Sequence, residues 1–282
     1  MVLAGFIAAL IAVEVHAHAL PPYVPRLDHV VVVVMENEGW GAIIGNPAAP
    51  YINSLAATGA NFSQAYAVTH PSQPNYLSLF SGTNQGVTDD SCPHHFVGIP
   101  NLGSQMIAAG FSFGGYSEDL PSVGYTGCSV ASYHRRHNPW VNFDTVPSAS
   151  NRPFSAFPTD YSMLPRLSFV VPNLCNDMHD CPIATGDAWL SAHLDGYAQW
   201  AGSHASLLVV LWDEDDYSGS NRVPEIFVGA TVQPGTYAET FDHYDTLRTL
   251  EDMFGLAPLG NAATATAIVD IWNDRLFGEN FD

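Results

Sequence analysis

The distribution of apolar positions along the chain predicts buried strands. Continuous apolar runs rich in β-branched residues occur at five places: His29 to Met35, Phe111 to Tyr116, Leu167 to Val171, Leu207 to Trp212 and Ile226 to Val228. Runs of this kind, without alternating polar residues, are typical of strands buried on both faces, as in a parallel sheet covered by helices.

The stretches between these runs favour helices. Apolar residues recur there at three-to-four spacing, in Pro50 to Thr58, Pro74 to Ser81, Leu102 to Ala109, Asp187 to Trp200 and Tyr244 to Phe254. Alternation of strands and helices predicts an α/β fold, a three-layer sandwich with a mostly parallel central sheet. In such folds the functional site lies beyond the carboxyl ends of the strands. No linker or repeat divides the chain, so we expect a single domain over residues 20–282.

The composition narrows the range of partners. The chain has 282 residues, 28 acidic and 8 basic side chains, a formal net charge of -20 and 47% apolar residues. Enough apolar surface is present for a large core, so a disordered chain is excluded. Such an acidic chain is repelled by polyanions, so we expect no nucleic-acid partner, and any phosphate must be bound at a local site. Without a heptad run or an obvious exposed apolar stripe, we expect a monomer.

The first 19 residues resemble a secretory signal. An apolar run is followed by small residues that end in Ala17-His18-Ala19, an Ala-x-Ala cleavage pattern. The run is too short to span a bilayer, so we expect a secreted protein without stable membrane insertion. The alternative is an amphipathic amino-terminal helix.

The cysteine count fits an exported protein. Four cysteines allow three pairings into two disulfides, and we favour Cys92 with Cys128 and Cys175 with Cys181. The second bridge would close a short loop that presents a carboxylate and an imidazole. A zinc site is the rival interpretation, but no Cys-x-x-Cys spacing supports it.

Acidic and amide side chains follow two of the predicted strands. Glu36 and Asn37 come directly after the first run, and four acidic residues, Asp213 to Asp216, come after the run that ends at Trp212. Clustered carboxylates need a cation or protons, and an oxygen-rich set suits a hard divalent ion such as Mg²⁺, Ca²⁺ or Mn²⁺. We expect a divalent metal ion held by Glu36, Asn37, Asp213 and Glu214. Asp215 and Asp216 are expected to be solvated; the alternative is that the whole acidic loop is solvated.

Ser72 is a candidate nucleophile. Pro74 suits the first turn of a helix, so Ser72 is placed just ahead of a helix amino terminus, where free N–H groups stabilise an anion. There the hydroxyl can attack phosphorus while a metal lowers its pKa and the Asn75 amide binds the phosphate oxygens. The simpler alternative is an N-cap.

Two histidine segments complete the candidate chemistry. His137 follows Arg135 and Arg136, the only arginine pair in this acidic chain, and His179 lies in the loop between Cys175 and Cys181. An imidazole can bind phosphate or protonate a leaving alkoxide. His243, at the start of the last long helix, is a further candidate.

Taken in order, these segments resemble the phosphoesterase family of bacterial acid phosphatases and phospholipases C, within the alkaline phosphatase superfamily. The chain is most similar to its small secreted acid phosphatases of mycobacterial type, which act on monoesters including phosphoinositides. The resemblance runs from about His29 to the carboxyl terminus and includes Glu36-Asn37, His70-Pro71-Ser72-Gln73-Pro74-Asn75-Tyr76, Arg136-His137-Asn138-Pro139, Asn176-Asp177-Met178-His179-Asp180, Trp212-Asp213-Glu214-Asp215 and His243-Tyr244.

The resemblance implies roles for single residues. It implies metal ligation by Glu36, Asn37, Asp213 and Glu214, nucleophilic attack by Ser72, catalytic His137 and His179, and substrate binding by Asn75, Arg136, Asp177 and His243. The Asp-His-Gly element of many superfamily members is replaced by Asp213-Glu214-Asp215, which favours one ion or loosely held metal over a two-zinc site. Thr69 stays an alternative to Ser72, although Ser72 fits the spacing to Pro-Asn better.

Three functions follow as hypotheses. The first is a secreted phosphomonoesterase that forms a phosphoryl-enzyme intermediate on a small phosphate-ester or phosphoinositide substrate. The second is a phospholipase C-type diesterase, and the third is a non-catalytic extracellular metal-binding module.

Overall fold

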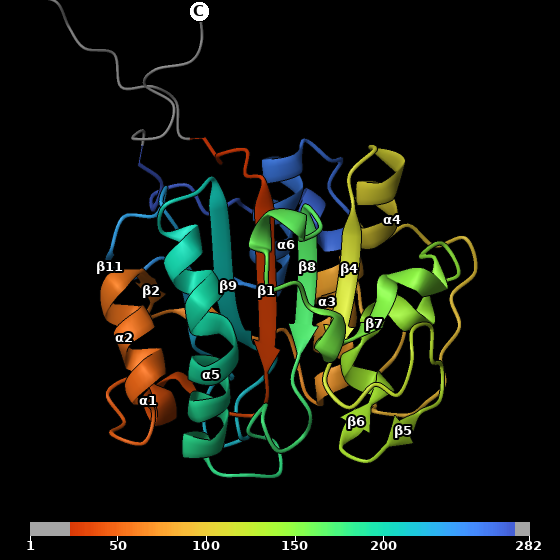
Figure 1. The fold of residues 1–282 in the computed structure, drawn as a ribbon, viewed down its shortest axis with the longest axis horizontal. Coiled ribbons are helices and arrows are strands. Elements are labelled where there is room, and N and C mark those ends of the chain that lie inside the picture. Colours follow the sequence, from red (N-terminus) through yellow and green to blue (C-terminus); the bar gives the residue numbers. More distant parts are fainter. Residues whose placement is uncertain (1–22, 274–282) are drawn as a thin grey trace, which may run out of the picture.

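A mixed eight-stranded sheet forms the centre of the molecule. The computed structural model describes residues 23–273, so the predicted signal at residues 1–19 lies outside the described residues. The strand order is β11-β2-β10-β9-β1-β8-β4-β7 (Figure 1). The strands are β1 (His29–Met35), β2 (Ala60–Phe62), β4 (Phe113–Ser117), β7 (Asn151–Pro153), β8 (Leu167–Val171), β9 (Ser206–Trp212), β10 (Glu225–Val228) and β11 (Gly235–Tyr237). In the described sheet β10 is antiparallel to both of its neighbours, and the other adjacent pairs are parallel, which confirms the prediction of a mostly parallel sheet.

Helices cover both faces of this sheet. They are α1 (Trp40–Ile43), α2 (Pro50–Thr58), α3 (Ser72–Ser81), α4 (Leu102–Ala108), α5 (Ile183–Ala201) and α6 (His243–Phe254). Side chains of β1 alternate between two cores: Val32 packs in the core that contains α3, α4 and α6, and Val33 in the core that contains α2 and α5. The predicted three-layer sandwich is confirmed (Figure 1).

Smaller elements complete the connections. Two-stranded ladders pair β3 (Ala65–Tyr66) with β12 (Phe241–Asp242) and β5 (Ser129–Val130) with β6 (Tyr133–His134). Short 3-10 helices are η1 (Arg135–His137), η2 (Pro139–Asn142), η3 (Ser148–Ser150), η4 (Phe154–Ala156), η5 (Tyr161–Met163) and η6 (Gly260–Ala263). Within the described part of the chain, no helix combines the length and the apolar character that crossing a membrane requires.

Some boundaries differ from the predicted ones. The strand predicted from Phe111 begins at Phe113, and the helix predicted from Asp187 begins at Ile183. The helix predicted from Pro74 begins at Ser72. A proline is tolerated at the third helical position because the first N–H groups of a helix have no intrahelical partner, so Ser72 lies in the first turn rather than ahead of it.

The carboxyl ends of β1, β8 and β9 lie together at one edge of the sheet. Strand β1 pairs with both β8 and β9 in parallel. Beyond the strand ends, the Asp213 N–H donates to the Met35 carbonyl at 3.0 Å and the Glu36 N–H donates to the Asp177 carbonyl at 2.9 Å. These hydrogen bonds bring the residues after the three strands within reach of one another.

Candidate active site

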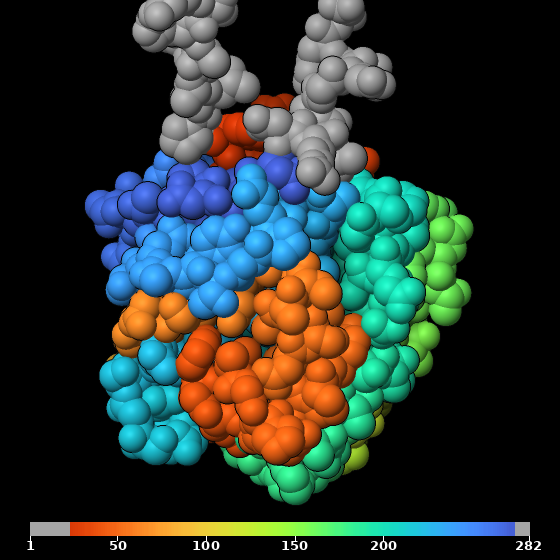
Figure 2. Space-filling view, turned by 90° about the vertical axis from the view of Figure 1, so that its left-hand side faces the viewer, coloured from red at the N-terminus to blue at the C-terminus, as the bar shows by residue number. Residues whose placement is uncertain are grey.

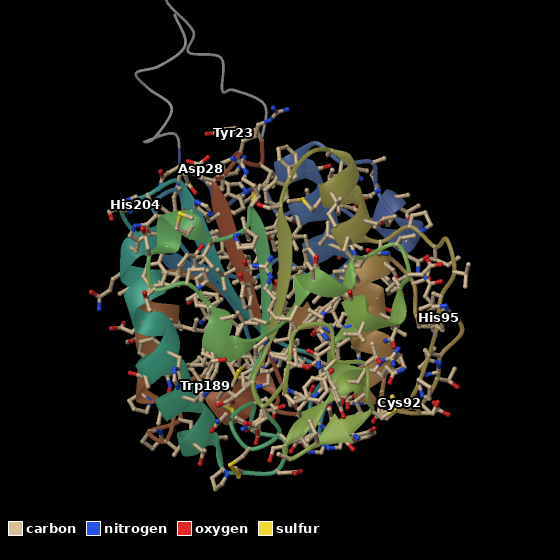
Figure 3. The ribbon with its side chains drawn as sticks, turned by 45° about the vertical axis from the view of Figure 1, so that its right-hand side comes forward. Tyr23, Asp28, Cys92, His95, Trp189 and His204 are labelled. Atoms are coloured by element: carbon tan, nitrogen blue, oxygen red, sulfur yellow. A yellow bond between two sulfur atoms is a disulfide. The ribbon has the colours of Figure 1, made fainter. Side chains whose placement is uncertain are left out.

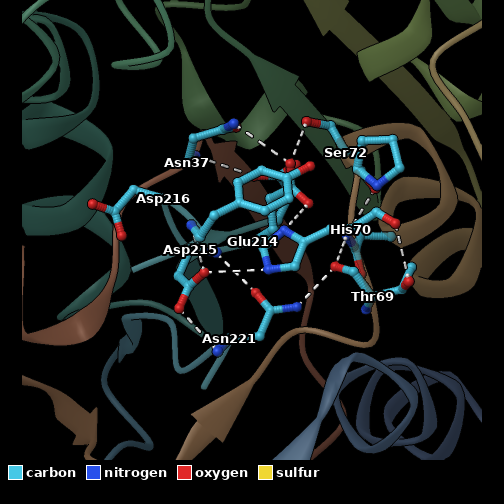
Figure 4. A network of polar contacts seen from close by, with 12 residues as sticks. Asn37, Thr69, His70, Ser72, Glu214, Asp215, Asp216 and Asn221 are labelled. Carbon is cyan, nitrogen blue, oxygen red and sulfur yellow. Dashed lines mark hydrogen bonds and ion pairs between the residues drawn. The ribbon is translucent and has the colours of Figure 1, made fainter. Parts of the chain in front are cut away.

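Ser72 lies at the centre of the residues that follow these strands. Its Oγ is 3.0 Å from Glu36 Oε2 and 3.1 Å from Glu214 Oε1, so its single proton can be donated to either carboxylate. Asn37 Nδ2 donates to the same Glu214 oxygen at 3.4 Å, and the Asn37 N–H donates to Asp213 Oδ1 at 3.3 Å (Figure 4). Ser72 is only 2% exposed. The structure thus brings the predicted nucleophile and all four predicted metal ligands together.

Four buried carboxyl groups form a cluster in which ionisation is unfavourable: Glu36, Asp177, Asp213 and Glu214. Burial raises the pKa of Glu36 and Asp213 well above the usual range, and the neighbouring carboxylates add to this effect. Burial likewise raises the pKa of Asp177 and of Glu214. Such a group of carboxylates is stable only when it is protonated or when a cation neutralises it.

The donor atoms of this cluster fit a divalent cation. Three buried oxygens, Asn37 Oδ1, Asp177 Oδ2 and Asp213 Oδ2, have no hydrogen-bond donor. Buried acceptors are almost always satisfied, so unsatisfied oxygens beside ionisable carboxylates indicate a place for a hard cation. Glu36, His137 and Asp177 also offer atoms within 4.8 Å of one another, a combination that the sequence interpretation did not predict.

His137 orients Glu36. Arg136 Nε donates to His137 Nε2 at 3.1 Å, which places the proton of the neutral ring on Nδ1. That nitrogen lies 3.2 Å from Glu36 Oε1 and 3.7 Å from Asp177 Oδ2. Burial lowers the pKa of His137 well below its usual value, with a further contribution from Arg136. In this arrangement the ring directs its Nδ1 proton at Glu36 and its lone pair at Arg136.

Tyr76 is a site residue that the sequence interpretation missed. Its hydroxyl donates to Glu36 Oε1, and its ring stacks on His137 with centroids 5.1 Å apart. Tyr76 lies four residues after Ser72 on α3, and helix residues at this spacing share a face. The spacing was therefore the signal that could have identified it.

Arg136 and His179 form a second side of the site. Arg136 Nη2 is 3.4 Å from His179 Nε2, and His179 Nδ1 is 2.7 Å from Asp180 Oδ1. The His179 N–H donates to Asp177 Oδ1 at 2.8 Å, so this loop positions a buried carboxylate and a partly exposed imidazole together. The rings of His137 and His179 are 6.1 Å apart, so the two candidate histidines lie in one site.

His70 forms the opposite side. Its Nδ1 is 2.6 Å from Glu214 Oε2 and its Nε2 is 3.3 Å from Asp215 Oδ1 (Figure 4). Asp215 is 2% exposed, so the prediction that it is solvated was wrong; Asp216 is exposed, as predicted. His70 was missed as a site residue although it belongs to the same motif as Ser72.

Asn75 and His243 hold the backbone around the site. Asn75 Oδ1 accepts from the N–H groups of Val68 and Thr69, and its Nδ2 donates to the Thr69 and Pro71 carbonyls. These four hydrogen bonds hold the backbone just before Ser72, so Asn75 helps to position Ser72. The predicted substrate contacts of Asn75 and His243 stay predictions.

His243 and Asp90 also form hydrogen bonds to backbone groups of the site, those of Asp213 and Gln73. His243 Nε2 is 2.7 Å from the Asp213 carbonyl, and burial lowers the pKa of His243 to about 4. Asp90 Oδ1 accepts from the Gln73 N–H at 2.9 Å. One N–H of the α3 amino terminus is therefore already paired, so the predicted anion site there has fewer free donors than expected.

The disulfides have the favoured pairing. Cys92 is bonded to Cys128 and Cys175 to Cys181, so the rival zinc site is excluded for these cysteines. Figure 3 shows Cys92 and His95 at the side of the molecule opposite α5. The Cys175–Cys181 bridge closes the loop that carries Asp177 and His179.

Comparison with known proteins identifies the family. The model of the phosphoesterase family matches residues 46–257. A phosphatidylinositol-3-phosphatase of Mycobacterium tuberculosis is 54% identical over 96% of this chain and 90% of its own length. An acid phosphatase of Aspergillus fumigatus is 29% identical over 81% of the chain, and a phosphate-repressible acid phosphatase of Penicillium chrysogenum is 31% identical over 74%. The chain spans little more than half the length of these two fungal relatives, 56% and 55%.

Solved structures show the same fold at low identity. An alkaline phosphatase superfamily protein from Vibrio parahaemolyticus aligns with a TM-score of 0.59 at 13% identity, covering 88% of this chain and 72% of that protein. The phosphonate monoester hydrolase of Silicibacter pomeroyi aligns with a TM-score of 0.57 at 13% identity, covering 90% and 78%. Together these findings favour an enzyme over the non-catalytic module. The chain belongs to the phosphoesterase family and is a phosphoric ester hydrolase.

Proposed function

We propose that the chain is a secreted phosphomonoesterase that transfers the phosphoryl group of its substrate to Ser72. The observation that carries this proposal is the position of Ser72 Oγ, within hydrogen-bond distance of Glu36 and Glu214. The alternative nucleophile Thr69 donates its hydroxyl to the His70 carbonyl at 3.2 Å. Ser72 is therefore the hydroxyl with a carboxylate ready to accept its proton.

The proposed reaction has two displacements. Ser72 Oγ loses its proton to Glu36 or Glu214 and forms a bond to phosphorus, while the bond from phosphorus to the alcohol oxygen breaks. His179 supplies a proton to the leaving alcohol, the neutral His137 ring holds Glu36 in place, and Arg136 binds the phosphoryl oxygens. Water then attacks the phosphoserine and gives a proton to His179, the bond from phosphorus to Oγ breaks, Oγ takes back its proton from the carboxylate, and phosphate leaves.

A divalent cation would be held by Glu36, Asn37, Asp213 and Glu214. When bound, it supplies positive charge that stabilises the serine alkoxide and the phosphoryl oxygens. Asp177, with its unsatisfied buried oxygen, and the donating ring of His137 would complete the surroundings of this group.

Replacement of Ser72 tests the nucleophile. We expect Ser72→Ala to lower kcat on phenyl phosphate by at least about a thousandfold, as loss of a nucleophile does in other covalent hydrolases. The matched control is Thr69→Val, which removes the rival hydroxyl and is expected to retain most of the activity. Rapid quenching with a ³²P-labelled ester should label the wild type and Thr69→Val, but not Ser72→Ala. Labelled Ser72→Ala with normal turnover would disprove the assignment, and full activity in excess EDTA would count against an exchangeable metal.

The monoester preference rests on the relatives. The M. tuberculosis relative is named a phosphatidylinositol-3-phosphatase and the fungal relatives are named acid phosphatases. We therefore propose phosphate monoesters, including phosphoinositides, as substrates. The phospholipase C-type alternative predicts faster hydrolysis of a diester than of a monoester of the same alcohol, and a phosphoinositide panel on the purified protein tests both.

Secretion is proposed from the cysteines and the first residues. Two disulfides persist in oxidising compartments and are rare in a reducing cytosol. Expression of the full chain in an exporting host should release a protein that begins at Leu20; a cell-retained protein that keeps Met1 would contradict the signal.

A further inference from the structure

The reactive centre is enclosed, so most of a substrate must remain outside it. Ser72 and Glu214 are buried, whereas His70 and His179 are partly exposed on two sides of them. Ser72 is hydrogen-bonded to Glu36 and to Glu214. Glu36 contacts His137, which lies beside Arg136, and Glu214 contacts His70. A phosphoryl group bound at Ser72 would occupy this buried centre, so the alcohol it is attached to has to lie at the rim, where His70 and His179 are partly exposed.

An aromatic ring covers His70 at this rim. Tyr217 stacks on the His70 ring with centroids 3.9 Å apart and planes at 23°. The Tyr217 side chain is nevertheless 64% exposed, so core packing does not account for it. The stacked His70 is itself 2.6 Å from Glu214, so the Tyr217 ring lies beside the acidic centre. Desolvation raises the pKa of Tyr217, as do the carboxylates of Glu214, Asp90 and Asp213.

The backbone of Tyr217 is held in an unfavourable conformation. Its φ is 63°, in the left-handed region that tyrosine rarely adopts. The Tyr217 N–H donates to Asp215 Oδ1 and the Asn221 N–H donates to Asp215 Oδ2, both at 2.9 Å, and Asn221 Nδ2 donates to the Thr69 carbonyl at 2.8 Å (Figure 4). Strain of this kind persists where the surroundings impose it, and it clusters at functional sites.

The loop that carries Tyr217 is anchored to two neighbouring segments. Asn221 ties it to the segment before Ser72, and the Arg222 carbonyl accepts from the Trp40 N–H at 2.9 Å. Figure 2 shows this cyan segment at the surface, beside the red to orange segments that follow β1. The backbone that carries the ring is thus tied to the neighbouring segments, and the ring itself rests on His70.

We propose that His70 and Tyr217 form a leaving-group subsite that binds the ring of a cyclic or aromatic alcohol. This inference rests on the proposed phosphomonoesterase function. The free face of Tyr217 offers an apolar, electron-rich surface, which stacks on aromatic rings or packs against the C–H face of an alicyclic ring. Open-chain alcohols gain little from it.

The test compares esters that differ in the presence of a ring. Cyclohexyl phosphate, phenyl phosphate and ethyl phosphate are assayed with the wild type, Tyr217→Asn and Tyr217→Phe. Asparagine tolerates a positive φ, so the loop is kept while the ring is removed. Met163→Ala is the matched surface control, since Met163 is 71% exposed and precedes the amino end of β8, at the opposite edge of the sheet.

We expect Tyr217→Asn to raise KM for the two ring-bearing esters by about threefold to tenfold, the range of single aromatic contacts. KM for ethyl phosphate, Ki for inorganic phosphate and all constants of Met163→Ala should stay within about twofold of the wild type. Tyr217→Phe keeps the ring, so it should keep the wild-type preference for ring-bearing over open-chain esters. If Tyr217→Asn leaves the ratio of KM for the ring-bearing esters to KM for ethyl phosphate unchanged, the proposed subsite is wrong. An equal loss on every ester and on phosphate binding, or an equal loss in Tyr217→Phe, also overturns it.

The same experiment distinguishes failure of the proposed subsite from failure of the proposed phosphomonoesterase function. If the wild type hydrolyses all three esters and Tyr217→Asn behaves identically, the subsite fails and the phosphomonoesterase stands. If the wild type hydrolyses none of them, the proposed function fails, and the subsite with it.

Discussion

Glu225→Gln is expected to abolish a pH-dependent loss of stability. Glu225 begins β10, is 1% exposed and lies between Leu211 of β9 and Phe62 of β2. Burial raises the pKa of Glu225 from 4.5 to about 8, and its Oε1 accepts only from the Thr246 hydroxyl, at 2.9 Å. The folded chain therefore keeps a proton that the unfolded chain releases between these two pH values.

The sign follows from this difference in bound protons. Unfolding releases a proton between pH 4.5 and about 8, so stability falls as pH rises through that window, by up to about 1.4 kcal/mol per pH unit. Between pH 5 and pH 7 the loss is about 2.5 kcal/mol. Glutamine retains the acceptor oxygen and has no proton to release, so the stability of the variant relative to the wild type should rise by that amount.

Urea unfolding at pH 5 and pH 7 measures the effect. The quantity compared is the free energy of unfolding of Glu225→Gln minus that of the wild type at each pH. Asp270→Asn is the control, because it removes one exposed carboxylate and changes the net charge equally. A difference that is the same at both pH values would refute the reasoning, as would an equal pH effect in the control.

Two further predictions concern packing and positioning. Gly115→Ala on β4 places a Cβ 2.2 Å from the Trp140 ring, so we expect a loss of about 3 kcal/mol in the free energy of unfolding, measured by urea titration; a loss below about 1 kcal/mol would show that the ring can shift. Glu118→Ala removes both acceptors of Asn176 Nδ2 and the acceptor of Trp189 Nε1, which hold the start of the loop that carries Asp177. We expect kcat to fall about tenfold with the shape of the pH profile altered, and partial recovery in Glu118→Gln; normal kcat in the alanine variant would contradict a positioning role.

The long apolar runs determined which parts of the fold could be predicted. Strand β1 and strand β8 have the predicted bounds, because runs such as Val30 to Val34 can be buried only between two helical layers. Strands β2, β7 and β11 have three residues each, and their pairing is set by tertiary contacts. Strands this short carry too little pattern to be predicted from the sequence.

The site could be predicted where it depends on strand ends and not where it depends on loop geometry. Glu36 and Asp213 meet because β1 and β9 are parallel neighbours, which the pattern implied. Asp215 was expected in solvent because its partners are backbone N–H groups of its own turn, and such turn contacts have no periodicity. His70 was missed for the same reason, since its contacts with Glu214 and Asp215 exist only after the two loops have docked.

The buried carboxylates connect metal binding to the activation of Ser72. When no cation is present, burial and the neighbouring carboxylates raise the pKa of Glu36, Asp177 and Asp213 and so favour their protonated forms. A protonated Glu36 cannot accept the Ser72 proton, so a cluster neutralised by protons loses one of the two carboxylates beside the nucleophile. Neutralisation by a divalent ion instead lowers the pKa of these groups and leaves them ionised. Removal of the ion should therefore weaken proton transfer from Ser72 to Glu36 and also take away the electrostatic stabilisation of the alkoxide.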